Sequence, residues 1–186
     1  MAVVKALLNR NSSPRLQQPA PTTEECEKLY QAALRAPDHG RIRPWRYLHI
    51  EGDARQQLGD LYAQAELQQD PDASPEKLAK LRNQSMRAPL IIVAIASPVE
   101  RDNVPRQEQI LSAGCGVHAL LVAAESLGYA GVWRTGPMAT NETVKAGLGL
   151  VGDEEVIGFI YLGTRLGDAK PLPKLSTHDF VSRWGC

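Results

Sequence analysis

The chain has 186 residues, 43% of them hydrophobic, and its 21 basic and 21 acidic side chains cancel. This composition suggests neither a disordered chain nor a membrane protein, and the zero net charge argues against a general nucleic-acid surface, which gains affinity from a basic excess. The three cysteines, Cys26, Cys115 and Cys186, are odd in number and widely spaced, so we expect no disulfide framework or zinc site and a reduced, cytoplasmic setting.

The length suits one domain over residues 1–186, and its first half reads mainly as helices. A short helix is expected over 3–9. A second helix starts at Thr22 or Thr23, where Glu25 is placed for a capping box, and ends at Pro37. Further along, the pattern predicts a strand over 47–50 and helices over 53–69 and 75–87.

The second half supplies the expected core. Residues 89–97 are β-branched and almost wholly apolar, which indicates a strand covered on both faces, and the run is too short to span a membrane. A helix over 107–127 is apolar nearly all round and should be the buried central helix. Strands over 129–134 and 156–164 and a helix over 142–148 follow. The tail over 174–186 carries Phe180, Val181 and Trp184 and is expected to pack on a partner.

A dense group of basic and aromatic side chains follows the second helix. Within residues 35–46 the chain offers Arg35, His39, Arg41, Arg43, Trp45 and Arg46. Guanidinium groups bind phosphate or carbonyl oxygens and tryptophan offers an apolar plane, so this loop is typical of a site for an anionic, aromatic ligand. The alternative is a solvated basic loop closed by a core tryptophan.

Three further clusters lie at the ends of expected elements: Arg10-Asn11-Ser12 with Arg15, the glycine-rich residues 128–136, and Gly163-Thr164-Arg165. The glycines would let a ligand approach the backbone, but they match neither a dinucleotide fingerprint nor a phosphate-binding P-loop. Two alternatives stay open from the residues alone: Arg10 and Ser12 could cap the first helix, and Trp133 could belong to the core.

Taken in order, these segments resemble one family. The segments are Arg-Asn-Ser-x-x-Arg, Arg-Ala-Pro-Asp-His-x-x-x-x-Pro-Trp, Pro-Arg-x-Glu-Gln-x-x-Ser-Ala-Gly-Cys, Gly-x-x-Gly-x-Trp-Arg-Thr-Gly and Gly-x-x-Tyr-Leu-Gly-Thr. Their joint occurrence is similar to the FMN-dependent nitroreductase family, in its minimal branch. The resemblance implies an α+β, nitroreductase-like fold with a central, mostly antiparallel sheet flanked by helices. It also implies an interlocked homodimer with FMN at the subunit interface and NADPH or NADH as electron donor.

Carried over by position, the resemblance implies a set of cofactor-binding residues. Arg10, Asn11 and Ser12 would hold the phosphate and ribityl end of FMN. Trp133, Arg134 and Thr135 would line the cofactor from the same chain, and Arg35 and His39 would come from the partner. The branch usually has a second arginine at the position of Asn11, a loss for which Arg15 or Arg165 could compensate.

The function implied is an oxidoreductase that passes electrons from NAD(P)H through FMN to nitroaromatics, quinones or a similar small acceptor by ping-pong kinetics, with no catalytic side chain required. A flavin-binding sensor or interaction protein without turnover is the first alternative. A domain whose arginine loop binds an acidic partner is the second.

Three residues outside this set have simpler interpretations. His118 is expected to be a satisfied core histidine and Cys115 a buried small side chain, with no metal site. Glu108 could only complement the dipole of its helix, or it could touch the cofactor region.

Overall fold

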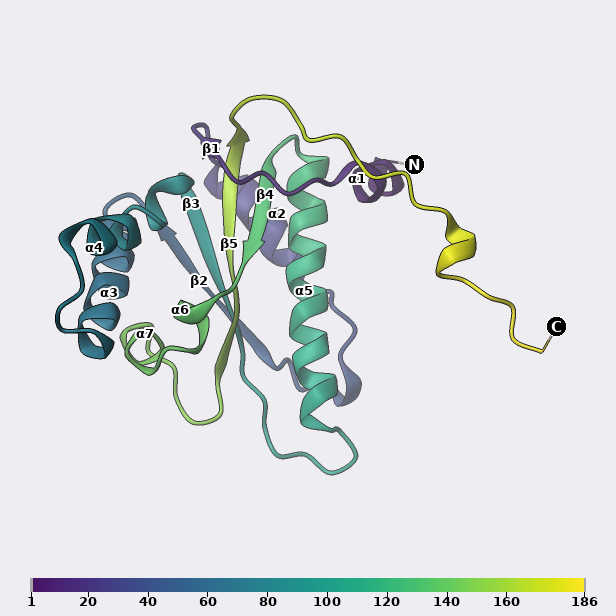
Figure 1. Ribbon diagram of the computed structural model, residues 1–186. Helices are drawn as coiled ribbons and strands as arrows, with labels where there is room; N and C mark the ends of the chain where they lie inside the picture. The colour runs from purple at the N-terminus through teal and green to yellow at the C-terminus, as the bar shows by residue number, and fades with distance from the viewer. Residues whose placement is uncertain (1, 186) are drawn as a thin grey trace.

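A five-stranded sheet with helices on both faces organises the chain (Figure 1). The computed structural model describes residues 2–185. The strands are β1 (Leu16–Gln17), β2 (Trp45–Glu51), β3 (Leu90–Ala96), β4 (Ala130–Arg134) and β5 (Glu155–Arg165). The helices are α1 (Ala2–Asn9), α2 (Thr23–Ala33), α3 (Ala54–Gln69), α4 (Pro75–Arg82), α5 (Arg106–Ser126), α6 (Pro137–Thr140) and α7 (Glu142–Gly147). Single 3₁₀ turns are η1 (His39–Arg41), η2 (Ser85–Arg87) and η3 (Thr177–Asp179).

Every pairing between the named strands is antiparallel, as the resemblance implied. The order is β1-β5-β3-β2, and β4 pairs with β5. The strand β5 is the longest, and β4 and β1 pair with successive parts of it, at residues 159–163 and 164–165. One strand, β3, is buried along its whole length, which confirms the prediction for residues 89–97.

Two hydrophobic cores explain why β3 is apolar at every position. Alternate side chains of a strand point to opposite faces of the sheet. On one face, Ile91, Val93, Phe159 and Tyr161 pack with Leu58 and Tyr62 of α3. On the other, Ile92, Ala94, Ile160 and Leu162 pack with Leu29 of α2 and Val117 and Leu120 of α5. Because helices cover both faces, neither side of β3 meets solvent.

Most expected helices appear with the ends that their sequence signals give. At the start of α2 the capping box is present: Glu25 N donates to Thr22 Oγ1 at 3.3 Å, and Thr22 N donates to Glu25 Oε2 at 2.9 Å. The helix expected to run to residue 87 ends instead at Arg82. There, Ser85 Oγ donates to the carbonyl of Arg82 at 3.0 Å, which satisfies a helix-terminal acceptor and allows the chain to turn. The strand β1 and the helix α6 were not predicted.

The helix α5 differs from expectation, because only one side of it is buried in the chain. The sheet and α2 cover one strip, whereas Leu111, Cys115 and His118 form an exposed strip at helical spacing. The predictions that Cys115 is buried and that His118 belongs to the core are therefore wrong for the single chain. Cys26 is buried and Cys115 is exposed, and both are free thiols; Cys186 lies outside the described residues.

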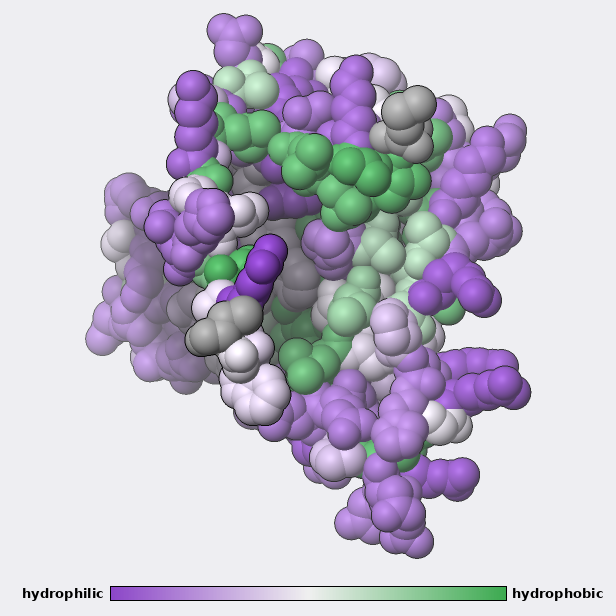
Figure 2. Space-filling model, turned by 90° about the vertical axis from the view of Figure 1, so that its right-hand side faces the viewer, coloured by the Kyte–Doolittle hydropathy of each residue, from purple (hydrophilic) through white to green (hydrophobic). Residues whose placement is uncertain are grey.

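The C-terminal tail leaves the body of the molecule on the side of α1 (Figure 1). Residues 166–185 are exposed throughout, and Trp184 is 100% exposed. Figure 2 shows hydrophobic residues gathered on this side of the molecule, where α1 contributes Val3, Val4, Leu7 and Leu8, all exposed. None of the helices within residues 2–185 is long and apolar enough to cross a membrane.

Candidate functional site

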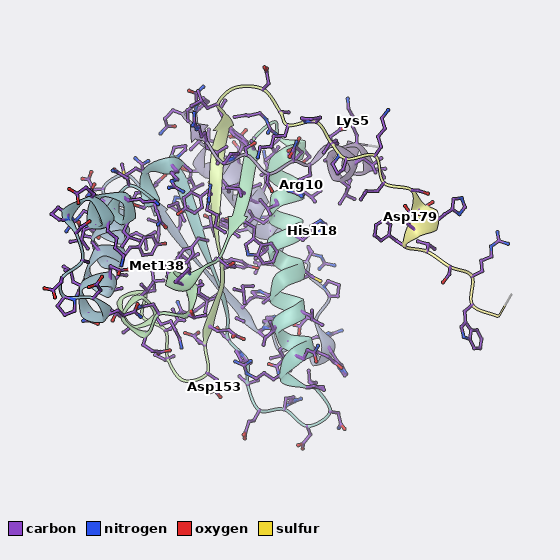
Figure 3. All side chains as sticks on the ribbon, viewed as in Figure 1. Lys5, Arg10, His118, Met138, Asp153 and Asp179 are labelled. Carbon is purple, nitrogen blue, oxygen red and sulfur yellow. The ribbon has the colours of Figure 1, made fainter. Side chains whose placement is uncertain are left out.

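The segment after α1 lies beside β4. Ser12 forms a parallel bridge with Gly131, and Ser13 N donates to Gly131 O at 3.1 Å. Gly131 also lets α5 and β5 pack closely against β4, since a Cβ there would lie 2.8 Å from a methyl carbon of Leu121 and 2.9 Å from one of Leu162. These contacts place Arg10 (labelled in Figure 3), Asn11 and Ser12, one of the predicted ligand-binding clusters, at the edge of the sheet.

Side chains from the end of β5 and from the tail hold this segment in place. Arg165 donates to Ser13 Oγ, and the Asn11 side-chain amide donates to the carbonyl of Lys170. Asn11 therefore ties the segment to the start of the tail, and Arg165 ties it to the end of β5.

Arg134, the last residue of β4, is the centre of a basic cluster. It donates to Pro14 O at 3.3 Å and lies over the ring of Tyr161, with its guanidinium carbon 5.4 Å from the ring centre. Its Nε is buried and has no hydrogen-bond partner among the described residues. A buried donor without a partner is costly, and a ligand oxygen would satisfy it.

Two cavities adjoin Arg134, of about 330 and 490 Å³. Arg87 of η2 lines both, Thr135 lines the smaller and Arg15 the larger. Burial raises the pKa of the Tyr161 phenol, and the positive charges of Arg134 and Arg87 oppose that shift. The cavities thus lie in a region of positive potential that favours an anionic ligand group.

A larger groove, of about 930 Å³, lies on the other face of the sheet. It is mainly apolar, and its lining comprises Pro37, Arg106, Ile110, Leu111, Gly114, Cys115, His118, Trp133, Glu155, Val156 and Ile157. Figure 3 shows His118 on α5, whose exposed strip forms one wall. Arg106 and Glu155, whose charged groups are 3.1 Å apart, give the groove one polar end.

The indole of Trp133 also lines the groove. Its Nε1 donates to Ile157 O at 2.9 Å. The ring occupies space that only glycine leaves free, because a Cβ at Gly158 would lie 2.0 Å from that nitrogen. Trp133 is therefore held as a partly exposed plane, 39% accessible, and does not belong to the core.

Trp133 and Arg134 consequently face opposite sides of the sheet. Trp133 lies opposite Ile160, of the core beneath α5, and Arg134 opposite Phe159, of the core beneath α3. A ligand that contacts both would have to reach around the edge of β4 that faces the segment of Ser12 and Ser13. Since Gly131 O faces that edge toward Ser13, strand alternation directs the backbone N–H and C=O of Trp133 to the same edge.

The loop with Arg35 and His39 is a separate group. Both side chains are exposed, and no hydrogen bond or ion pair among the described residues joins them to Arg10, Asn11, Ser12 or β4. The loop reaches the groove through Pro37. Within one chain, the predicted site residues therefore fall into two groups.

Arg46, which the sequence placed with the ligand-binding group, has a structural role. It donates to both carboxylate oxygens of Glu154, at 2.7 and 2.6 Å, and to Gly149 O at 2.9 Å. The Arg46 guanidinium lowers the pKa of Glu154 to about 2, aided by a hydrogen bond from Ser97. This guanidinium is not available to a ligand.

Two residues outside the predicted site set lie beside members of it. Arg87 lines both cavities together with Arg134. In the sequence it stood out only as a basic residue just before the strand β3. Glu108, in the first turn of α5, accepts a hydrogen bond from His39, with 2.8 Å between Oε2 and Nδ1. In the part of the chain that the structure describes, no group of three or more His, Cys, Asp or Glu residues is placed to hold a metal ion.

Comparison with known proteins gives consistent matches. The model of the Nitroreductase family matches residues 7–164. The protein of Escherichia coli strain K12 named "Putative NAD(P)H nitroreductase YdjA" is 38% identical over 164 residues, 88% of either chain. A "Putative NAD(P)H nitroreductase" of Haemophilus influenzae is 33% identical over 184 residues, covering 98% of this chain and 99% of the relative.

Solved structures agree on the fold. A nitroreductase-like family protein from Bacillus cereus superposes with a TM-score of 0.85 at 18% identity, covering 100% of this chain and 97% of the other. A variant of the FMN and NADPH-dependent nitroreductase NfnB from Sphigopyxis sp. strain HMH gives 0.79 at 17% identity over 100% of both chains. The NADPH:FMN oxidoreductase of Vibrio harveyi, complexed with NAD⁺, gives 0.77 at 17% identity, covering 100% of this chain and 78% of the other.

Proposed function

The chain belongs to the nitroreductase family, and on that premise we propose that it is an FMN-dependent oxidoreductase. Its electrons come from NADPH or NADH and pass to a nitroaromatic, a quinone or a similar small acceptor. The names of two structural neighbours support the choice of cofactors, since one is an FMN and NADPH-dependent nitroreductase and the other an NADPH:FMN oxidoreductase.

The observation that carries the proposal is the buried, unpartnered Nε of Arg134 between two cavities lined by arginine. FMN offers a phosphate and two ring carbonyls, which are the acceptors that guanidinium groups bind best. In this proposal Arg10, Asn11 and Ser12 hold the phosphate and ribityl end. Trp133, Arg134 and Thr135 contact the ring along the edge of β4.

We further propose a homodimer with FMN at the subunit interface. Within one chain no hydrogen bond of the described residues joins Arg35 or His39 to Arg134, and the family resemblance assigns these two residues to the site of the partner chain. The exposed strip of α5, the apolar face of α1 and the tail with Phe180 and Trp184 supply the hydrophobic surface for such an interface. Assembly would bury these side chains, including Cys115 and His118.

FMN, if bound by these residues, would supply the redox chemistry, which is hydride transfer from a nicotinamide and two-electron reduction of an acceptor. The protein contributes binding and electrostatics. Arg134 and Arg87 favour negative charge on a ligand at the edge of β4, and the indole of Trp133 offers an apolar surface on which a flat acceptor can stack. One pocket serves donor and acceptor in turn, which predicts ping-pong kinetics. No proton-transferring side chain is required. We further propose that the protein acts in the cytoplasm.

The visible absorbance spectrum of the purified protein, before and after anaerobic NADPH or NADH, tests this function. Flavin bands that bleach would support the oxidoreductase. Bands that persist with both nucleotides would favour a flavin-binding sensor without turnover. A protein that takes up no flavin when FMN is added would refute the proposal and leave a domain that binds an acidic partner.

A further inference from the structure

The loop that carries His39 has a strained backbone held by neighbouring side chains. Arg41 and Arg43 have φ values of 56° and 55°, in the left-handed region that favours glycine. The carboxylate of Asp38 accepts hydrogen bonds from Ile42 N at 3.2 Å and Arg43 N at 2.7 Å. Backbone strain fixed in this way is typical of segments that must present a side chain in one position.

The N-terminal half of α5 supports this loop at two points one helical turn apart. Ser112 Oγ donates to the carbonyl of Pro37, and Glu108 Oε2 lies 2.8 Å from His39 Nδ1. Residues four apart on a helix share a face, so α5 presents both groups to the loop together.

The partner of His39 determines which ring nitrogen carries the hydrogen. A carboxylate only accepts, so the nitrogen that faces Glu108 must be the donor. In the neutral imidazole one nitrogen donates and the other accepts, which leaves Nε2 as an acceptor. Nε2 makes no hydrogen bond to any residue between 2 and 185.

We propose that Glu108 is a positioning residue: it holds His39 in the Nδ1–H tautomer and so presents Nε2 to the cofactor as a hydrogen-bond acceptor. The inference rests on the proposed function, in which His39 reaches the FMN of the partner subunit. The matching group on FMN is then a donor, the ring N3–H or a ribityl hydroxyl. The simpler expectation, that neutral His39 donates to a carbonyl or phosphate, is incompatible with a donating Nδ1.

The competing explanation is that Glu108 only complements the dipole of α5. Glu24 offers a matched control, because it also lies in the first turn of a helix, α2, and its carboxylate pairs with Lys28 at 2.9 Å instead of with a histidine. Glu108→Ala and Glu24→Gln both remove a first-turn charge, but only the first removes the partner of His39.

The test is nitrogen NMR of protein labelled in its histidines, recorded near pH 8.5, where imidazoles are generally neutral. The His39 signals are identified by their loss in His39→Asn. We expect the Nδ1–H tautomer in the unsubstituted protein and in Glu24→Gln, and a shift toward the Nε2–H tautomer in Glu108→Ala. If Glu108→Ala does not fold, Glu108→Leu takes its place, because its side chain has a similar size and cannot accept a hydrogen bond from Nδ1. A wild-type His39 in the Nε2–H form, or no tautomer change on removing Glu108, would overturn the proposal.

A second measurement, FMN affinity by fluorescence titration, separates this inference from the function on which it rests. One lost hydrogen bond predicts a rise in Kd of about five- to tenfold in Glu108→Ala. The same change in a His39→Ala background should leave Kd within about twofold, since the two residues act as a unit. Equal effects in both backgrounds would refute positioning through His39. A wild-type protein that binds no FMN would refute the proposed function and the cofactor contact, while the tautomer spectra would still report whether Glu108 orients the ring.

Discussion

Adding one methyl group at Gly158 should displace Trp133 from its place in the groove. A Cβ there would lie 2.0 Å from Trp133 Nε1 and 2.5 Å from its Cδ1, closer than real contacts allow. The three nearest heavy atoms all belong to Trp133. The indole must therefore move, and its hydrogen bond to Ile157 O at 2.9 Å breaks.

The expected cost follows from two contributions. Overpacking of a filled site costs about 1–3 kcal/mol, and the lost hydrogen bond about 1 kcal/mol. Because Trp133 is 39% exposed and can swing outward, we expect the lower part of the sum, about 2–3 kcal/mol of unfolding free energy. In a Trp133→Ala background the clash is absent, and Gly158→Ala should be neutral or stabilising by about 0.5–1 kcal/mol, since alanine is less flexible than glycine.

The assay is urea unfolding of the FMN-free protein followed by far-UV circular dichroism, at one protein concentration so that association contributes equally. The wild type, both single variants and the double variant form a cycle whose coupling energy should be about 2–4 kcal/mol. If Gly158→Ala costs the same with and without Trp133, the indole is not where the structure has it and the reasoning fails.

Three further outcomes are expected. Arg35→Ala should weaken FMN binding without changing the melting temperature, because its side chain is exposed; unchanged flavin occupancy would exclude Arg35 from the site. Glu154→Gln should lower stability at pH 7 by about 2–3 kcal/mol: the folded-state pKa of Glu154 is depressed from 4.5 to about 2, so its contribution is present above pH 4.5 and lost as pH falls toward 2. Acid titration of unfolding should therefore show a shallower slope between these values in Glu154→Gln than in wild type, and parallel curves would contradict this. Truncation after Gly167 should weaken the dimer in sedimentation velocity, because it removes the exposed Phe180 and Trp184; a wild-type monomer that retains FMN would refute the shared site.

Sequence patterns were sufficient where the deciding interactions are local. The capping box of Thr22 and Glu25 spans three residues, and both of its hydrogen bonds are present. The apolar run over residues 89–97 predicted a strand covered on both faces, because a strand with an exposed face would alternate with polar residues. The order of the short motifs was likewise enough to identify the family, which the match over residues 7–164 bears out.

Sequence patterns failed where a side chain's role depends on a distant partner. Arg46 resembled the other arginines of its loop, yet its partner Glu154 is 108 residues away and makes it structural. His118 and Cys115 looked like core residues because α5 is apolar nearly all round, but α2 and the sheet cover only one side of it.

The sequence by itself determined most of the elements, the antiparallel α+β architecture that the family resemblance implied, and the chemical types of the candidate site residues. Only the tertiary structure decided that Trp133 and Arg134 face opposite sides of a strand, that Arg87 and Arg134 line the same cavities, and that Glu108 meets His39 across 69 residues of chain. The physical reason is that periodicity and caps act within a few residues, whereas burial, ion pairs and tautomers are set by whichever distant groups the fold brings within hydrogen-bond distance.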